Sequence, residues 1–126
     1  MFNYVFMPGS LLLVDDEKPL LALLSRYLER LGYQVESCES GWEALRLCHD
    51  SKRRYDVVVL DLGLPDMPGL EVLNAVLASN ENLRVLVSSG TPFSPEFLPP
   101  SQRARVGSLL KPFVPKMLDA ALRNLV

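Results

Sequence analysis

Apolar and polar residues follow two patterns that alternate along the chain. Short apolar runs occupy residues 11–14, 34–38, 55–60, 83–87 and 106–110, and longer segments with apolar residues at helical spacing separate most of them. Short runs of this kind are typical of buried β-strands. Strands that alternate strictly with helices predict a parallel sheet covered by helices on both faces.

The helical segments carry start and stop signals. Pro19 falls in the first turn of the first helix, where proline is tolerated, and Gly32 ends it. Ser40 and Glu43 have the spacing of a capping box, so the second helix is predicted to start at Gly41. Apolar positions predict the buried stripe of each helix: Leu20, Leu24, Leu28 and Leu31 in the first, and Trp42, Leu45 and Cys48 or His49 in the second.

The third and fifth helices differ sharply from the segment between them. The third is predicted to bury Leu70, Leu73, Val76 and Leu77, and the fifth to bury Met117, Leu118, Ala121, Leu122 and Leu125. The segment 91–102, where a fourth helix belongs, contains four prolines. A proline inside a helix costs about 3 kcal/mol. We therefore expect helix four to be short or distorted and to start at Pro99 or Pro100.

Charged and hydroxyl side chains stand where the predicted strands end. Asp15 and Asp16 follow the first strand, Asp61 ends the third, Ser89 follows the fourth and Lys111 follows the fifth. The carboxyl ends of parallel strands share one edge of the sheet, and ligands bind at that edge. Each residue alone has an ordinary interpretation, such as a helix cap, a turn or a solvated lysine. Together they predict a site for a divalent cation and a phosphoryl group.

The residue types fit phosphoryl chemistry. Clustered carboxylates repel one another unless a cation joins them, and Mg²⁺ prefers carboxylate, water and phosphate oxygens. A carboxylate can also attack phosphorus to give an aspartyl phosphate. The Lys111 ammonium and the Ser89 hydroxyl can then interact with the phosphoryl oxygens.

Composition narrows the class further. The 126 residues suffice for one domain, 48% of them are hydrophobic, and the net charge of −2 argues against nucleic acid or an anionic membrane as the main partner. No apolar stretch is long enough for membrane insertion. Cys38, Cys48 and His49 lack the spacing of a zinc site. We interpret the cysteines as reduced thiols of a cytoplasmic protein.

Four motifs resemble those of the receiver domain of a two-component response regulator. They are Val14–Glu17, Leu60–Gly69, Ser89–Gly90 and Lys111–Phe113, and the resemblance extends from about residue 11 to residue 125. It implies an α/β, flavodoxin-like (CheY-like), doubly wound five-stranded parallel sheet with strand order 2-1-3-4-5. Function is then implied as well: Asp61 accepts a phosphoryl group from a histidine kinase or a histidine phosphotransfer domain.

The resemblance also implies the other roles at the site. Asp16 would bind Mg²⁺ directly, Asp15 mainly through water, and Asp61 and the backbone carbonyl of Gly63 would complete the protein ligands. Ser89 would be the switch hydroxyl and Lys111 the phosphate-binding lysine, as the catalytic partners of Asp61.

Three features depart from the family pattern. Ser108 stands where an aromatic ring is frequent, the segment before it is rich in proline, and Gly63 replaces a side chain that usually overlooks the phosphoryl group. Our hypothesis is a modified switch, or signalling through helix one or the helix-five face.

Two other functions compete with a phosphorylated receiver. One is a receiver-like scaffold that binds partners without phosphorylation, which gains nothing from clustered charges. The other is a Mg²⁺-dependent aspartyl phosphatase, which usually needs a second acid two residues after the nucleophile, where this chain has Gly63. We therefore expect a signalling switch rather than an enzyme that turns over a small molecule.

The domain boundaries follow from the first strand. Residues 1–9 are predicted to be an N-terminal extension, an expression remnant or a docking segment, and residues 10–126 the receiver domain. The aromatic residues Phe2, Tyr4 and Phe6 suggest a contact that forms a homodimer. The chain is either a single-domain regulator or the receiver of a longer protein that carries an output domain.

Overall fold

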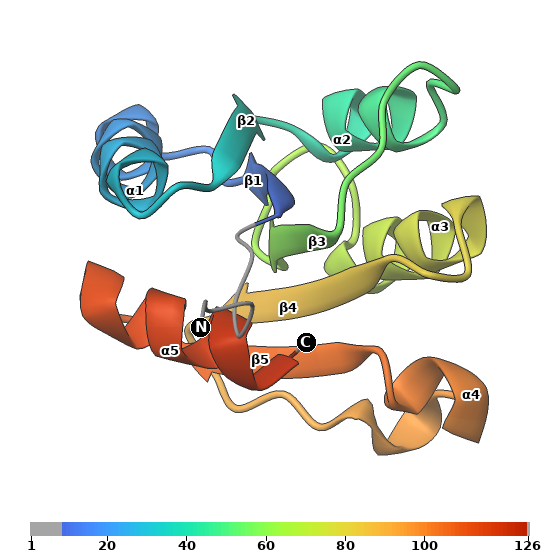
Figure 1. Ribbon diagram of the computed structural model, residues 1–126. Coiled ribbons are helices and arrows are strands. Elements are labelled where there is room, and N and C mark those ends of the chain that lie inside the picture. The colour runs from blue at the N-terminus through green and yellow to red at the C-terminus, as the bar shows by residue number, and fades with distance from the viewer. Residues whose placement is uncertain (1–8, 126) are drawn as a thin grey trace, which may run out of the picture.

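Five parallel strands form one sheet in the order β2-β1-β3-β4-β5 (Figure 1). This computed structural model describes residues 9–125. Every pair of neighbouring strands is parallel. The strands are β1 (Ser10–Val14), β2 (Gln34–Cys38), β3 (Val57–Asp61), β4 (Arg84–Ser89) and β5 (Val106–Leu110). The predicted fold class and strand order are confirmed.

Helices cover both faces of the sheet. In chain order they are α1 (Lys18–Arg30), α2 (Gly41–Cys48), α3 (Gly69–Ser79), α4 (Pro100–Arg103) and α5 (Pro115–Leu125), with a short 3₁₀ helix at Pro95–Phe97. Helices α1 and α5 pack on one face, and α2 and α3 pack on the other (Figure 1). Each face has its own apolar core, because strand side chains alternate between the two faces.

The third strand is the centre of the fold. Every residue of β3 is buried, from Val57 to Asp61, because strands flank it on both sides and helices cover both of its faces. The edge strands β2 and β5 are much more exposed. The strand that ends in Asp61 is therefore the central and fully buried strand of the sheet.

The fourth helix is a single turn, as the prolines predict. It covers only Pro100–Arg103 and begins with proline in its first turn. Between β4 and this turn, the chain contains only the 3₁₀ helix at Pro95–Phe97. The side of β5 that faces α4 is consequently not covered by a long helix (Figure 1).

The predicted buried stripe of α2 is wrong. Trp42 is 73% exposed and His49 is exposed, while Leu45 and Cys48 are only half-buried. The buried positions are instead Gly41, Ala44 and Leu47. The reason is close packing: a Cβ atom at Gly41 would lie 2.8 Å from a methyl group of Val72 on α3, so small residues face the neighbouring helix.

Three other predicted core residues are exposed. Leu31, Leu70 and Met117 lie at the ends of their helices: Leu31 caps the C-terminus of α1, and Leu70 and Met117 are in the first turns of α3 and α5. The interior positions of the same stripes, such as Leu28 and Leu73, are fully buried. Helical spacing therefore predicted the correct face for these three helices but extended it too far.

The amino end of the described chain joins the sheet directly. The carbonyl oxygen of Gly9 accepts a hydrogen bond from the backbone N–H of Gln34 at 3.0 Å. The rest of the predicted extension, residues 1–8 with their aromatic side chains, lies outside the described residues. Between residues 9 and 125, no helix has the length and apolar character needed to cross a membrane.

Candidate functional site

Strand register brings the predicted site residues to one edge of the sheet. Val14 pairs with Leu60, so Asp15 and Asp16 leave β1 beside Asp61 at the end of β3. On the other side of β3, β4 ends at Ser89, next to the end of β5. The backbone N–H of Lys111 donates to the carbonyl of Ser89 at 2.8 Å and holds the last two strand ends together.

Three carboxylates form an acidic cluster. One oxygen from each of Asp15, Asp16 and Asp61 lies within 4.8 Å of the others. Asp15 and Asp61 are only 6% and 7% exposed, whereas Asp16 is exposed. Oxygens on opposite sides of a Mg²⁺ ion lie about 4.2 Å apart, twice the typical Mg–O distance. The spacing and the all-oxygen donor set therefore fit this ion with little movement.

Lys111 reaches across the strand ends into the same cluster. Its Nζ lies 2.8 Å from Asp15 Oδ2, 3.5 Å from Asp61 Oδ2 and 3.8 Å from Glu17 Oε1. Burial alone lowers the pKa of Lys111, but the hydrogen bond to Asp15 and the charges of Asp15 and Asp61 outweigh it, so the pKa is raised. Lys111 is thus a fixed positive charge beside the buried carboxylates.

The Asp61 carboxylate has a defined orientation. Its Oδ1 accepts a hydrogen bond from the backbone N–H of Gly63 at 2.9 Å, and its Oδ2 faces Lys111. A Cβ atom added at Gly63 would lie 3.5 Å from Oδ1, an ordinary contact distance. Glycine therefore leaves the approach to Asp61 more open than a larger residue would.

The Ser89 hydroxyl is held by its own loop. It accepts a hydrogen bond from the backbone N–H of Thr91 at 3.2 Å and lies 3.4 Å from the Thr91 hydroxyl. Sequence reasoning missed Thr91, although a hydroxyl residue two positions after a strand-end serine is a signal for this kind of turn. Ser89 lies at the expected edge of the sheet and bonds to Thr91 in the arrangement described here.

Sequence reasoning also missed Asp66, which braces the loop after Asp61. The two carboxylate oxygens of Asp66 accept hydrogen bonds from the backbone N–H groups of Gly41 and Trp42, at 2.9 and 3.0 Å. These hydrogen bonds lower the pKa of Asp66. Ser40 caps the next N–H group of the same helix from within the predicted capping box. The loop that follows the buried aspartate is thereby attached to the start of α2.

The doubly wound sheet and its acidic edge define a class of α/β proteins that gather carboxylates at the carboxyl ends of parallel strands. Residues 11–123 match the family described as the response regulator receiver domain, and the chain belongs to this family. The response regulator MprA of Mycobacterium sp. (strain KMS) is 34% identical over 120 residues, which cover 95% of this chain and 51% of that protein. The chain thus spans about half the length of this relative.

Solved structures show the same likeness. The chemotaxis protein CheY4 of Vibrio cholerae superposes with a TM-score of 0.79 at 28% identity, covering 94% of this chain and 99% of that one. A Burkholderia pseudomallei response regulator superposes with a TM-score of 0.76 at 26% identity, covering 90% of this chain and 66% of that one. The latter structure contains a phosphorylated aspartic acid and a calcium ion.

Proposed function

We propose that this receiver domain is a phosphorylation-dependent switch in a cytoplasmic two-component phosphorelay and that Asp61 is its phosphoacceptor. The main support is one arrangement: a buried carboxylate at the end of the central strand, with two further carboxylates within 4.8 Å and an ammonium group 3.5 Å away. The donor is a phosphohistidine on a histidine kinase or a histidine phosphotransfer domain.

The acidic cluster would hold Mg²⁺ through Asp15, Asp16, Asp61 and the Gly63 carbonyl. When bound, the ion neutralises negative charge on the phosphoryl oxygens. Asp15 already bonds to Lys111 at 2.8 Å, which fits a more indirect role for it, whereas exposed Asp16 is open to a direct one.

In the proposed transfer step Asp61 and Lys111 act from their present positions, and the Ser89 hydroxyl moves. A carboxylate oxygen of Asp61 attacks phosphorus, a P–O bond forms, and the P–N bond to the donor imidazole breaks with its electron pair going to nitrogen. The Gly63 N–H keeps the carboxylate oriented. Lys111 stabilises the charge on the phosphoryl oxygens from the side, and the Ser89 hydroxyl binds one of them after it leaves Thr91.

The alternatives explain less of the site. A scaffold that needs no phosphorylation gives no reason for gathering three carboxylates within 4.8 Å around a single ammonium group, because like charges held this close repel one another. The phosphatase function needs a general acid two residues after Asp61, and this chain has Gly63 there. We therefore assign the domain to signalling and not to turnover of a small molecule.

Phosphorylation by a small donor tests this function. The protein is incubated with acetyl phosphate and Mg²⁺, and its intact mass is recorded over time. We expect the mass of one phosphoryl group in the wild-type protein and in Asp50→Asn, because Asp50 lies before β3 and so away from the site edge. Asp61→Asn should show no gain.

Each competing function gives a different result in this mass assay. A scaffold would remain unmodified in all three proteins while still binding its partner. A phosphatase would consume acetyl phosphate steadily without accumulating the modified form. A gain that persists in Asp61→Asn would assign the acceptor role to another residue.

A further inference from the structure

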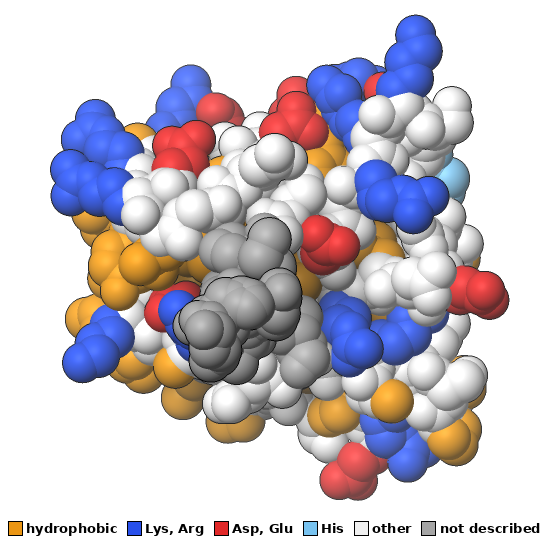
Figure 2. Space-filling model, viewed as in Figure 1, with side chains coloured by type: hydrophobic (Ala, Val, Ile, Leu, Met, Phe, Trp, Pro, Cys, Tyr) orange, Lys and Arg blue, Asp and Glu red, His pale blue; other side chains and the backbone are white. Residues whose placement is uncertain are grey.

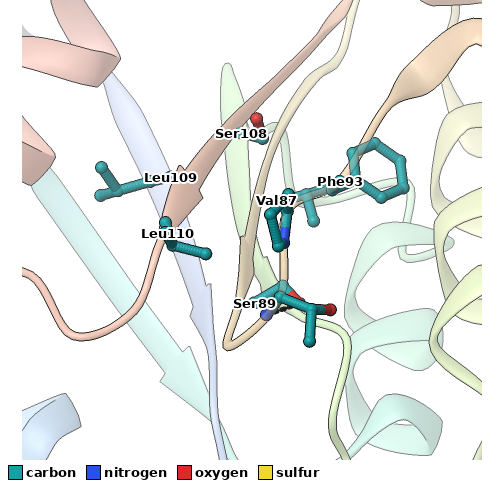
Figure 3. A pocket seen from close by; sticks show the side chains of 8 residues that line it. Val87, Ser89, Phe93, Ser108, Leu109 and Leu110 are labelled. Atoms are coloured by element: carbon teal, nitrogen blue, oxygen red, sulfur yellow. Dashed lines mark hydrogen bonds between the residues drawn. The ribbon is translucent and has the colours of Figure 1, made fainter.

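A cavity lies beside Ser89 on the sheet face that a long fourth helix would cover. Its volume is about 270 Å³, and it opens between β4, β5 and the loop after β4 (Figure 3). Its lining residues are Val87, Ser89, Thr91, Pro92, Phe93, Ser108, Leu109 and Leu110. Two features create it: α4 is a single turn, and Ser108 is too small to fill the space.

The cavity is large enough for an aromatic ring, and its wall is partly apolar. A cavity of about 150 Å³ already binds benzene. Leu110 is 51% exposed here, although it faces the cavity beside Val87 (Figure 3). An apolar ring placed against Leu110 would remove this surface from water, which is favourable.

Phe93 is the aromatic residue of the cavity wall. Its ring packs edge-to-face on Phe97, with the ring centroids 5.8 Å apart and an interplanar angle of 85°. In Figure 3 the ring lies on the far side of Val87 from Leu110 and is directed away from Ser89. Phe97 is itself exposed, whereas Phe93 is half-buried and also packs against the core between the sheet and helices α2 and α3, so the Phe93 ring keeps some exposure in its present position.

One short segment connects Phe93 to the candidate switch hydroxyl. Ser89 is hydrogen-bonded to Thr91, two residues before Phe93. The intervening residues form no helix or strand, and a Cβ atom at Gly90 would meet no atom within 4 Å. Displacement of the Ser89 hydroxyl would therefore break the hydrogen bond that joins β4 to this segment, and only the packing of Phe93 would still hold it.

We propose that Phe93 is the positioning residue of the modified switch. When Asp61 is phosphorylated, the Ser89 hydroxyl leaves Thr91 for the phosphoryl group, and the Phe93 ring leaves Phe97 and enters the cavity against Leu110. This rests on the proposed function. The phosphoryl group shifts the equilibrium because it bonds to Ser89 in only one of the two arrangements.

Among residues 9–125, we find no other aromatic residue near the site with the same opportunity. Phe113 lines a separate cavity with Glu17, Leu20, Lys111 and Pro112. Phe97 does not line the cavity beside Ser89. Phe93 is therefore the ring that can enter the cavity beside Ser89 by a change of its side-chain and loop conformation alone.

A tryptophan reporter tests the movement. Trp42 is the only tryptophan of the chain and is exposed, so Trp42→Phe gives a dark background into which Phe93→Trp is introduced. With Mg²⁺ and beryllium fluoride as the phosphoryl mimic, we expect a blue shift of the emission and weaker quenching by acrylamide. A Phe97→Trp reporter in the same background should become more exposed, because it loses its ring partner.

Two variants locate the cause. Asp61→Asn added to the Phe93→Trp reporter should abolish the response. Ser108→Phe fills the cavity from β5, so in that protein the emission of the reporter should not shift while acetyl phosphate still adds its mass. In the wild-type protein, NMR should show contacts between the Phe93 ring and the Leu110 methyl groups only with beryllium fluoride, which excludes an effect of the tryptophan itself.

The outcomes separate the two proposals. Normal phosphorylation with a Phe93 ring that stays on Phe97 would overturn the movement and leave the phosphoacceptor assignment intact. Absence of phosphorylation in the wild-type protein would overturn the proposed function and the movement with it. A blue shift that persists in Asp61→Asn would also refute the coupling, because the ring would then move without the acceptor.

Discussion

Asp16→Asn should be more stable than the wild-type protein in the absence of metal. It should be less stable than the wild-type protein when Mg²⁺ is present. Asp16 has two carboxylate neighbours within 4.8 Å, and the Lys111 ammonium contacts Asp15 and Asp61 instead. At 4.8 Å each repulsion is worth about 0.9 kcal/mol at the dielectric constant of water. Lys111 offsets part of the sum, so the substitution should gain about 1 kcal/mol without metal.

Magnesium should reverse the order of stability of the wild-type protein and Asp16→Asn. A ligand at a hundred times its Kd stabilises a folded protein by about 2.7 kcal/mol, and a variant that binds a hundredfold more weakly gains only about 0.4 kcal/mol at that concentration. Wild type would then exceed Asp16→Asn by roughly 1 kcal/mol after the initial difference is subtracted. In a domain of this size, 1 kcal/mol corresponds to about 4 °C in Tm.

Thermal unfolding in EDTA measures the stability difference without metal, and thermal unfolding in excess Mg²⁺ measures the difference with metal. Glu96→Gln is the matched control, because it removes an exposed carboxylate that does not belong to the cluster. Its difference from wild type should be the same in both conditions. The reasoning fails if Asp16→Asn is less stable than wild type in EDTA, or if Mg²⁺ raises the Tm of both proteins equally.

Three further predictions concern the stability of the fold and the reactivity of its thiols. Asp66→Asn should lower the urea midpoint at pH 7. Because the pKa of Asp66 is lowered in the folded protein, its contribution to stability is complete above the ordinary value of 3.8 and is lost as the pH falls through the lowered pKa, so the two midpoints should converge in acid. Leu73→Ala should cost about 3 kcal/mol in urea unfolding, whereas Trp42→Ala should change stability by less than about 0.5 kcal/mol, and equal losses would contradict the burial described here. Burial raises the pKa of Cys38 to about 12 and of Cys48 to about 11, so both native thiols should react slowly with a disulfide reagent at pH 8, and Cys48, which is half-buried, should react first.

The sheet and the acidic edge could be predicted because their signals are local. The run from Val57 to Leu60 is apolar at every position, which indicates a strand buried on both faces. Once β3 is central and parallel, the residue after that run has to lie at the carboxyl edge. The convergence of Asp15, Asp61 and Lys111 follows from topology alone, and their contacts bear it out.

What the sequence could not provide depends on how elements pack against each other. The α2 stripe was predicted from its large apolar residues, yet the face that contacts α3 needs Gly41 because the two helices lie too close for a Cβ atom there. The same holds for Asp66, whose partners Gly41 and Trp42 are more than twenty residues away. Neither contact has a signal within a single helix or strand.

The region around β5 shows the same limit. The prolines predicted a short α4, and Ser108 was recognised as small, but the size of the space between them depends on where the loop after β4 runs. The position of Phe93 on Phe97 follows from that path and from no periodic pattern. The candidate switch is therefore a feature that only the three-dimensional arrangement reveals.

Chemical trapping of the acyl phosphate tests most directly whether Asp61 is the acceptor. The protein is treated with acetyl phosphate and Mg²⁺ and then with sodium borohydride, which reduces an aspartyl phosphate to homoserine, and its peptides are sequenced by mass spectrometry. We predict homoserine at position 61 and aspartate at positions 15 and 16. Homoserine at position 15 or 16, or unreduced aspartate at all three, would contradict the assignment of the buried β3 carboxylate as the phosphoacceptor.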